Sequence, residues 1–382
     1  MFSVVTVPAV TGEPQVWTST RTGLQAPYLA AVVAPLAGIE LDLPTVVTAR
    51  LCHASVTLAR ATARSVLHRP LALAEAMASS RIEGVVADAL DVGLTQLGRR
   101  TGPAARLTAA AATATDIAAG AVAPLDDLAL TCHLALLGTD PAWAGRAGVW
   151  RTQQVWIGRP GSTPATAAFV PPRAAHVPAA MSDLARFADR DDIPALALAA
   201  LVHAQLETIH PFGDGNGRVG RALVQTTLAR AGIIGPGPVP LSVGLLADAG
   251  GYIEALRAFR DGDVTPIVDA FTQAAASAAA TIEHLEPDLT AHLDAARDRL
   301  TATVRPQAAA WRVLDLLPEH PVLDAPTVRR LTGLTGAAPH RALDQLARAG
   351  VLTEVTASAR NRVWVHDGVL ASIERAVAVH RW

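Results

Sequence analysis

The chain has 382 residues, which is too many for one compact core, so we expect two or three domains. Its formal net charge of −2 excludes a strong overall field for nucleic acid or membrane. Alanine supplies much of the 51% hydrophobic content, and no stretch reads as a membrane-spanning helix. Because the first residues lack a secretion signal, the sequence predicts a cytoplasmic protein with no membrane partner.

Cysteine and lysine usage narrows the chemistry further. Cys52 and Cys132 lie far apart among apolar neighbours, which predicts buried free thiols and neither a disulfide framework nor a metal site. The sequence contains no lysine, so arginine carries every cationic side chain. Every mechanism that needs a catalytic or phosphate-binding lysine is therefore excluded.

Apolar residues recur at helical spacing along most of the chain before residue 300. One interruption alternates apolar and polar residues at 149–158 and returns near 167–172, which predicts two short strands. The segments that predict helices are, in order, 58–80, 83–100, 177–189, 194–212, 218–232, 249–263 and 264–286.

The last 80 or so residues change character, as expected of a separate small domain. Short helices are predicted within 311–321, 324–333 and 335–350, followed by a two-stranded wing at 351–366. This tail resembles a winged helix-turn-helix. We therefore expect three parts, over residues 1–120, 121–300 and 301–382.

A glycine-rich stretch, "HPFGDGNGRVGR", occupies His210 to Arg221. A Walker A loop is excluded because it requires lysine, and the G-x-G-x-x-G from Gly215 to Gly220 follows a predicted helix where a dinucleotide loop follows a strand. An EF-hand beginning at Asp214 fails because Val219 occupies the obligatory glycine position. None of these three glycine-rich loops fits.

The residues of the stretch describe an anion-binding loop at the start of a helix. Arg218 and Arg221 are three residues apart, so both guanidinium groups can grip a polyphosphate from one helix face. Asp214 is placed to hold a Mg²⁺ ion that keeps most of its waters. His210 is the natural general base, because histidine is the residue type whose ordinary pKa lies near neutral pH. Together they suit group transfer from a Mg-nucleotide to a hydroxyl.

The same stretch resembles the signature loop of the Fic family, H-P-F-x-[DE]-G-N-G-R-x-x-R, at every fixed position, and the resemblance extends over about Asp126 to Glu283. It implies a mainly α fold, with a helical core, a small β-hairpin flap and a helical N-terminal region that carries an inhibitory helix. It also implies adenylyl transfer from ATP with Mg²⁺ to a Ser, Thr or Tyr hydroxyl of a target protein or of the chain itself. The implied roles are general base for His210, Mg²⁺ ligand for Asp214, and phosphate contacts for Gly215, Asn216, Gly217, Arg218 and Arg221.

A second stretch, "SSRIEG" at residues 79–84, has two interpretations. Taken alone, Ser80 and Glu83 form a capping box that would begin a helix. Beside a Fic loop, Ser79, Glu83 and Gly84 resemble the family's inhibitory motif, in which Glu83 would compete with the γ-phosphate for Arg221. The resemblance favours the inhibitory interpretation.

Two further features follow from the resemblance. The segment from Val155 to Val170 would dock the target backbone as an added strand, although a surface hairpin that closes the core is an equally good interpretation. His203, Glu207 and His210 do not match a zinc-binding spacing, and the resemblance makes Glu207 a residue that packs the helix or orients the loop.

The C-terminal part is mildly basic, with ten arginines against seven acidic residues from residue 305 onward. The residues that could contact DNA are Arg329, Arg330, His340, Arg341, Arg360 and Arg362. Protein contact or homodimer formation is the alternative use of such a domain. The sequence therefore leaves open an adenylyltransferase, an enzyme that removes AMP or transfers another nucleotide, and a DNA-binding regulator whose core senses nucleotide.

Overall fold

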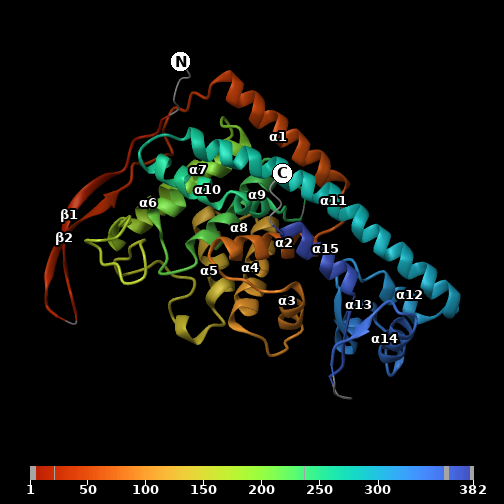
Figure 1. The fold of residues 1–382 in the computed structure, drawn as a ribbon. Helices are drawn as coiled ribbons and strands as arrows, with labels where there is room; N and C mark the ends of the chain where they lie inside the picture. The colour runs from red at the N-terminus through yellow and green to blue at the C-terminus, as the bar shows by residue number, and fades with distance from the viewer. Residues whose placement is uncertain (1–5, 21, 236, 357–360, 379–382) are drawn as a thin grey trace. The chain divides into compact units, whose positions relative to one another are not determined.

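The computed structural model describes residues 6–20, 22–235, 237–356 and 361–378. Figure 1 shows a mainly helical chain with two small antiparallel sheets. Two compact units account for the fold: Met1–Ala59 with Thr113–Pro236 and Asp248–Ala276, and Arg60–Ala112 with Gly237–Ala247 and Ser277–Trp382. No helix within the described ranges is long and apolar enough to cross a membrane.

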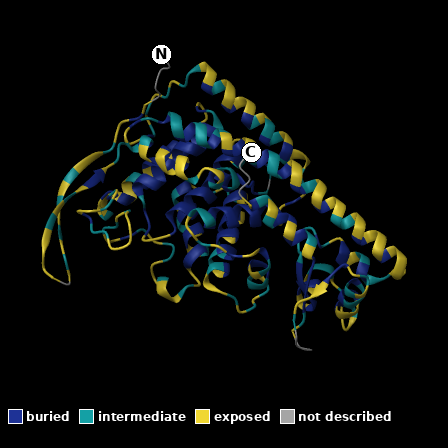
Figure 2. Cartoon of the chain, in the orientation of Figure 1, coloured by how far each residue is buried: buried dark blue, intermediate teal, exposed yellow. Residues whose placement is uncertain are grey.

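The first unit is built around helix α7 (Ala195–Ile209), which is buried at every position from Leu196 to Ile209. A helix that is apolar on nearly all sides is stable only when other helices surround it. Helices α6 (Val177–Ala188), α8 (Asn216–Arg230) and α10 (Ala249–Arg260) pack against α7, and α5 (Leu125–Leu137) packs against α6 and α8. Figure 2 shows the resulting concentration of buried residues on α7 and α8.

The first unit also contains a hairpin that the sequence patterns did not reveal. Strands β1 (Thr11–Thr18) and β2 (Gln25–Val32) pair antiparallel from Thr11 opposite Val32 to Thr18 opposite Gln25. The backbone N–H of Ala31 donates to the carbonyl of Val170 at 2.9 Å, so β2 is also tied to the predicted flap. Pro14 and Pro27 interrupt the usual strand composition, which explains why the hairpin was not predicted.

In the second unit, α2 (Arg69–Ile82) packs against α9 (Leu241–Ala247) and α15 (Asp367–Val377), and α15 also contacts α3 (Ala89–Gln96). The carboxylate of Glu75 on α2 accepts bonds from the backbone N–H and the hydroxyl of Ser242 at the start of α9. The predicted helix over 58–80 is broken at 65–68, just before Pro70, and its first part belongs to α1 (Thr45–Arg64).

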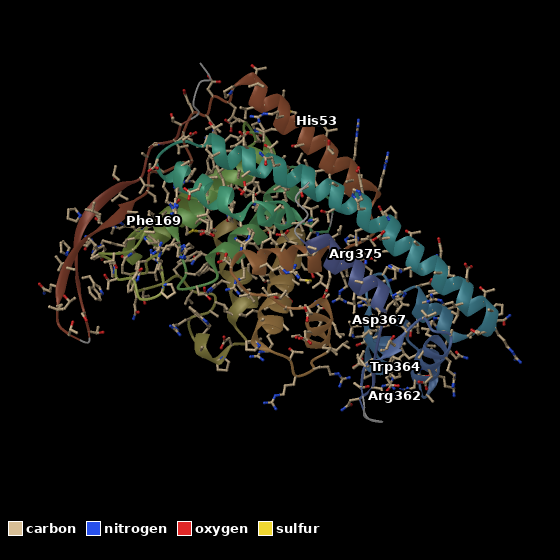
Figure 3. All side chains as sticks on the ribbon, in the orientation of Figure 1. His53, Phe169, Arg362, Trp364, Asp367 and Arg375 are labelled. Carbon is tan, nitrogen blue, oxygen red and sulfur yellow. The ribbon has the colours of Figure 1, made fainter. Side chains whose placement is uncertain are left out.

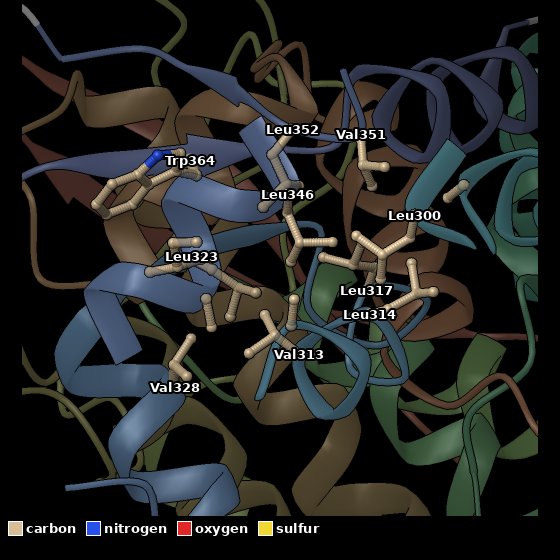
Figure 4. Close-up of a cluster of buried hydrophobic side chains, with 14 of the residues drawn as sticks. Leu300, Val313, Leu314, Leu317, Leu323, Val328, Leu346, Val351, Leu352 and Trp364 are labelled. Atoms are coloured by element: carbon tan, nitrogen blue, oxygen red, sulfur yellow. The ribbon is translucent and has the colours of Figure 1, made fainter. Parts of the chain in front are cut away.

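The C-terminal segment forms a small core of its own, drawn in Figure 4. Helices α12 (Ala309–Leu314), α13 (Ala325–Thr332) and α14 (Ala338–Arg348) pack with a sheet of order β3-β5-β4 (Val322–Asp324, Val363–Val365, Thr353–Glu354). Trp364, Leu343 and Leu346 are fully buried in this cluster. The three predicted helices are present and the two predicted strands pair as β4 and β5, whereas β3 and α15 were not predicted.

Two long helices complete the chain. Helix α4 covers Pro103–Gly120, and α11 covers Thr265–Thr303, so it continues 17 residues beyond the predicted end at Glu286 despite Pro287. Cys132 is a buried free thiol as expected, but Cys52 is exposed, which corrects the prediction that both are buried. The polar outward face of α1 around Cys52 could not be separated from its inward face by composition alone.

Candidate functional site

His210 lies at the turn between α7 and the glycine-rich loop. Its backbone N–H donates to the carbonyl of Leu206 at 2.7 Å, and the residue itself adopts a left-handed conformation with φ 51° and ψ 62°. Such a conformation is uncommon for a residue with a Cβ atom, and strained backbone of this kind concentrates at functional sites. The left-handed turn ends α7, and the loop begins there.

Arg151 holds this strained turn in place, and the sequence did not reveal it. Its Nε donates to the carbonyl of His210 at 2.8 Å, and its own backbone N–H donates to the carbonyl of Pro211 at 2.9 Å. The remaining guanidinium nitrogens donate to the carbonyls of Gln153 and Pro172 and, more weakly, of Ile209. Burial lowers the pKa of Arg151 to about 10, so it stays charged at neutral pH.

The loop is anchored by Phe212 and Asn216. Phe212 is fully buried and stacks on the ring of His133 with centroids 3.9 Å apart. The Asn216 side chain accepts from the Phe212 N–H at 2.9 Å and donates to the Phe212 carbonyl at 3.0 Å. Asn216 was expected to contact phosphate, but its side chain instead closes the loop on itself. The Asn216 amide has a second N–H besides the one that donates to Phe212, so its predicted phosphate contact stays a prediction.

His133 on α5 contacts the same loop through a hydrogen bond and a ring stack. Its Nδ1 accepts from the backbone N–H of Gly148 at 2.9 Å, so its Nε2 carries the proton and donates to the carbonyl of Asp214 at 3.2 Å. Burial lowers the pKa of His133 to about 4, which keeps the ring neutral and preserves this tautomer. This pairing of α5 with the loop could not be predicted from sequence.

The loop ends in the N-terminus of α8. Gly215 has φ 78°, and a Cβ atom there would lie 2.8 Å from a methyl carbon of Leu136, so only glycine fits. The first helical hydrogen bond runs from Val219 N–H to the carbonyl of Gly215. The backbone N–H groups of Asn216, Gly217 and Arg218 therefore have no acceptor within the helix and can bind an anion.

Arg218 is the clearest sign that this site can bind an anion. Its side chain is 5% exposed, and Nε and Nη1 have no hydrogen-bond partner among the residues that the structure describes. Its Nη2 lies 3.3 Å from a carboxylate oxygen of Asp214, which is 55% exposed. Buried donors without acceptors are costly, so Arg218 is placed for an external anion.

Arg221 lies one turn further along α8 and is also buried, with 2% exposure. One of its contacts is the hydroxyl of Tyr252 on α10, 3.5 Å from Nη1, and this hydroxyl is 2.6 Å from Nε2 of His203. The sequence predicted both arginines on one helix face, and the structure buries both. Tyr252 on α10 therefore contacts both Arg221 on α8 and His203 on α7.

Glu207 faces His210 across the last turn of α7. Its Oε2 lies 3.7 Å from Nδ1 of His210, which is within ion-pair range but longer than a hydrogen bond. Burial alone would raise the pKa of Glu207, but attraction to His210 and Arg221 outweighs it and holds the pKa at about 2. Glu207 is therefore an ionised carboxylate inside the unit.

The residues fit a Mg²⁺ ion that arrives with a nucleotide. Over the described ranges, no three His, Cys, Asp or Glu side chains gather into a metal-binding cluster. Mg²⁺ bound to a nucleotide needs one or two carboxylates and takes its other ligands from phosphate and water. The half-exposed Asp214 carboxylate at the mouth of the loop can supply one such ligand.

The predicted flap is less regular than expected. Ile157 and Phe169 form a single antiparallel bridge through two backbone hydrogen bonds of 2.8 and 3.1 Å, so the expected pair of strands reduces to one bridged pair. Phe169, labelled in Figure 3, lies under the guanidinium of Arg260 at 3.9 Å. Burial lowers the pKa of Arg260, an interior cation that sequence reasoning missed.

The inhibitory motif residues lie at the end of α2, in the second compact unit. Ser79 is buried in the last turns of α2, Glu83 is the residue that caps its C-terminus, and Gly84 follows with φ 75°. A capping box requires a helix that begins here, so that interpretation is wrong: this segment ends a helix, and α3 begins only at Ala89. Position within a helix, which only the fold decides, separates the two interpretations.

The predicted DNA-contact residues are distributed over the C-terminal part. Arg329, Arg330, His340 and Arg341 are exposed on α13 and α14. Arg362 instead forms ion pairs with Asp344 at 2.7 Å and Glu354 at 2.6 Å, and its guanidinium stacks on the ring of Trp364. Figure 3 labels Arg362 and Trp364. Acidic residues of the same C-terminal part therefore neutralise the positive charge of Arg362. Arg360 lies outside the described residues.

Comparison with known proteins shows which proteins the segment around this site resembles. Residues 125–228 match the Fic/DOC family. The chain is 34% identical over 148 residues to protein adenylyltransferase fic-1 of Caenorhabditis elegans, covering 38% of this chain and 25% of that protein. It is 30% identical over 155 residues to protein adenylyltransferase Fic of Nematostella vectensis, covering 38% and 30%. The chain thus spans between a quarter and a third of the length of these curated relatives.

A solved structure extends the comparison beyond the matched segment. The crystal structure of a Fic family protein from Desulfovibrio desulfuricans G20 aligns with a TM-score of 0.55 over 88% of this chain and 98% of that one, at 19% identity. At this identity the likeness concerns the fold alone. It covers most of both chains, so the similarity of fold is not confined to the helices around the loop.

Proposed function

Because residues 125–228 are a Fic domain, we propose that this protein is an adenylyltransferase that transfers AMP from ATP to a protein hydroxyl. The observation that carries the proposal is Arg218, a buried cation with two unpartnered N–H groups beside the free N-terminus of α8. A nucleotide-sensing site needs those features but no general base. The left-handed turn that presents His210 beside them supplies one, and this favours an enzyme.

The reaction that these residues support is an in-line displacement. Nε2 of His210 accepts the proton of a Ser, Thr or Tyr hydroxyl as its oxygen attacks the α-phosphorus of ATP. The bond from the α-phosphorus to the bridging oxygen breaks, and pyrophosphate leaves with the electron pair. The N–H groups of Gly217 and Arg218 and the Arg218 guanidinium stabilise charge on the phosphates, with Arg221 toward the β and γ positions. Mg²⁺, held by Asp214, would neutralise phosphate charge.

Autoinhibition is part of the proposal. Glu83, with Ser79 and Gly84 around it, would form a charge-assisted pair with Arg221 and so exclude the γ-phosphate. Two such hydrogen bonds, at about 1.5–3 kcal/mol each, would suppress productive ATP binding by ~10²-fold or more. The support for this role is the order Ser79, Glu83, Gly84 in the sequence, with Glu83 as an exposed residue at the C-terminal end of α2.

The decisive experiment compares three full-length proteins incubated with Mg-ATP: the wild type, Glu83→Gly and His210→Ala. Intact-mass analysis should show an AMP adduct on the chain or on a lysate protein with Glu83→Gly, little with the wild type and none with His210→Ala. If no variant forms an adduct even with lysate supplied, the transferase proposal is wrong. An equal rate in the wild type and in Glu83→Gly would refute autoinhibition alone.

The same measurement separates the related chemistries. An adduct of a different mass in a mixture of nucleoside triphosphates identifies transfer of another nucleotide. Loss of AMP from a previously modified target, without added ATP, identifies the reverse activity. The target, its hydroxyl type, a homodimeric state and the cytoplasmic location stay predictions.

Target docking at the segment from Val155 to Val170 remains a proposal as well. Its support is that the backbone at Ile157 and Phe169 already pairs as extended chain. A target strand added there would gain main-chain hydrogen bonds without depending on its side chains. Substitution of Ile157 by proline should raise KM for the target and leave KM for ATP unchanged.

A second candidate function concerns the C-terminal part, which we propose is a winged helix-turn-helix that binds duplex DNA. The supporting observation is a separation of charge. Its described acidic residues are engaged, for example Asp324 with Arg99 at 2.7 Å and Asp344 with Arg362 at 2.7 Å. Arg329, Arg330, Arg341 and Arg348 are exposed and have no ion-pair partner among the described residues.

Four phosphate contacts predict a salt slope of about −3.6 in the logarithm of the binding constant for B-DNA. Affinity for a fluorescent duplex should therefore fall by roughly 10²-fold between 50 and 200 mM salt. Combined substitution of Arg341 and Arg348 by glutamine should reduce the slope by about 2. Absence of binding at 50 mM salt would leave protein contact as the function of this part.

A further inference from the structure

Nδ1 of His210 poses a specific problem for a general base. This atom is buried and makes no hydrogen bond with any described residue. A neutral imidazole carries its proton on one nitrogen only, and a base that acts through Nε2 must carry it on Nδ1. Something must therefore accept or stabilise a proton at Nδ1.

The Glu207 carboxylate is the group that the structure offers. Its Oε2 lies 3.7 Å from Nδ1, its side chain is 10% exposed, and the two residues are three apart at the end of α7. The opposite tautomer would direct the Nδ1 lone pair at a carboxylate, which is repulsive. In the absence of substrates, hydrogen bonds of catalytic groups are often long and shorten when the complex forms.

The surroundings of Glu207 preserve its charge. Besides His210, the titratable or charged groups that interact with it are His203 on its own helix, Arg221 from α8 and Arg260 from α10. The positive charges of Arg221 and Arg260 favour the ionised form of the carboxylate. Arg151 fixes the backbone carbonyl of the same histidine at 2.8 Å, so the backbone and the ring of His210 are held separately.

We propose that Glu207 is a positioning residue that fixes His210 in the Nδ1–H tautomer, leaving the Nε2 lone pair for the target hydroxyl. The inference rests on the proposed function and deepens it. As Nε2 takes the hydroxyl proton, the ring becomes an imidazolium whose charge is balanced by the adjacent carboxylate. Glu207 itself keeps its negative charge and exchanges no proton.

The test uses full-length protein with ¹⁵N-labelled histidine and substitutes Glu207→Gln, which keeps the shape and removes the charge. The ¹⁵N shifts of His210, assigned by their loss in His210→Ala, should show a protonated Nδ1 in the parent protein. In Glu207→Gln the amide can donate to Nδ1, so the population should move toward Nε2–H. This readout needs no enzymatic activity, so it tests the pairing even if AMP transfer is not observed.

Kinetics in the Glu83→Gly background supply the second readout. Glu207→Gln should lower kcat by about 10²–10⁴-fold, the range for a misoriented or wrongly protonated general base, with little change in KM for ATP. Glu207→Asp should restore part of kcat because it restores the charge at a greater distance. Asp183→Asn is the matched control, since it neutralises another buried carboxylate that accepts from the N–H of Leu36 at 2.6 Å.

The control should lower the unfolding temperature and leave both the His210 tautomer and kcat unchanged. The proposal fails if His210 in the parent protein carries its proton on Nε2. It also fails if Glu207→Gln retains the parental tautomer, or if kcat and KM change by equal factors in Glu207→Gln and Asp183→Asn. A loss of kcat in Glu207→Gln that Glu207→Asp partly rescues, together with the tautomer shift, supports it.

Discussion

Replacement of Arg218 by methionine should stabilise the unliganded protein while it abolishes nucleotide binding. Methionine matches much of the aliphatic length of arginine without its donors. The two buried nitrogens of Arg218 that lack partners each cost about 1–3 kcal/mol, and removing them relieves that cost. The interaction lost is a single contact of 3.3 Å to Asp214, which is half-exposed and therefore worth at most about 1 kcal/mol. The free energy of unfolding should rise by about 1–5 kcal/mol.

The effect on ATP has the opposite sign. If Arg218 gives two charge-assisted hydrogen bonds to phosphate, their loss costs about 3–6 kcal/mol, or 10²–10⁴-fold in Kd. In the Glu83→Gly background, Mg-ATP at 100 times Kd stabilises the folded protein by about 2.7 kcal/mol, and this increment should vanish in Arg218→Met. The assay is the thermal unfolding midpoint with and without Mg-ATP.

Arg230→Met on the same helix provides the control. Its guanidinium is already paired with Asp189 at 3.2 Å and with the carbonyl of Ala123, so the midpoint should fall slightly and the ATP response should persist. A lower midpoint in unliganded Arg218→Met would mean that Arg218 has a structural role, and an undiminished ATP response would mean that it does not bind phosphate; either result would refute the reasoning.

Three other substitutions test how the loop is built. Arg151→Met should lower the free energy of unfolding, measured in urea, by about 3–5 kcal/mol, because it leaves several buried carbonyls without a donor. A loss below about 1 kcal/mol would contradict the role of Arg151 in holding the turn at His210. Asn216→Ala should cost about 1–3 kcal/mol and weaken ATP binding in calorimetry, because the Phe212 backbone loses both partners. Folding lowers the pKa of His133 from 6.5 to about 4, so the folded protein binds fewer protons there than the unfolded chain. The contribution of His133 to the free energy of unfolding is therefore complete above pH 6.5, and it falls by up to about 3 kcal/mol as the pH drops to 4. His133→Gln should flatten the measured pH dependence over that range, and an unchanged slope would assign it to other groups.

The signature loop illustrates how far local sequence information reaches. Its function depends on residues within twelve positions, and helix geometry fixes the relation of Arg218 to Arg221. The helices on either side were predicted because α7 and α8 are runs of helix-forming, mostly apolar residues with a glycine or proline at their ends. The Fic identity of this segment followed from the same residues and is confirmed by the match over 125–228.

Tertiary context overturned several local patterns. Ser80 and Glu83 have the spacing of a capping box, yet they end α2, because the chain before them is already helical and Gly84 takes a left-handed turn. The alternating segment near 149–158 retains only one bridged pair, since Arg151 draws its backbone onto the loop and away from a ladder. Secondary-structure propensity describes a segment in isolation, so it does not include the contacts with other parts of the chain that compete with the local pattern.

The sequence by itself predicted the chemistry that we propose for this protein: a phosphate-binding loop at a helix start, one histidine as a base, and one carboxylate for a nucleotide-borne metal ion. These features are local, so spacing along the chain defines them. Only the tertiary structure decided what holds them in position. Arg151 and His133 lie 59 and 81 residues from the groups they bond, and the pairing of Glu207 with His210 depends on a left-handed turn. Contacts between distant segments depend on how helices pack, and no pattern of residue types along one chain encodes that packing directly.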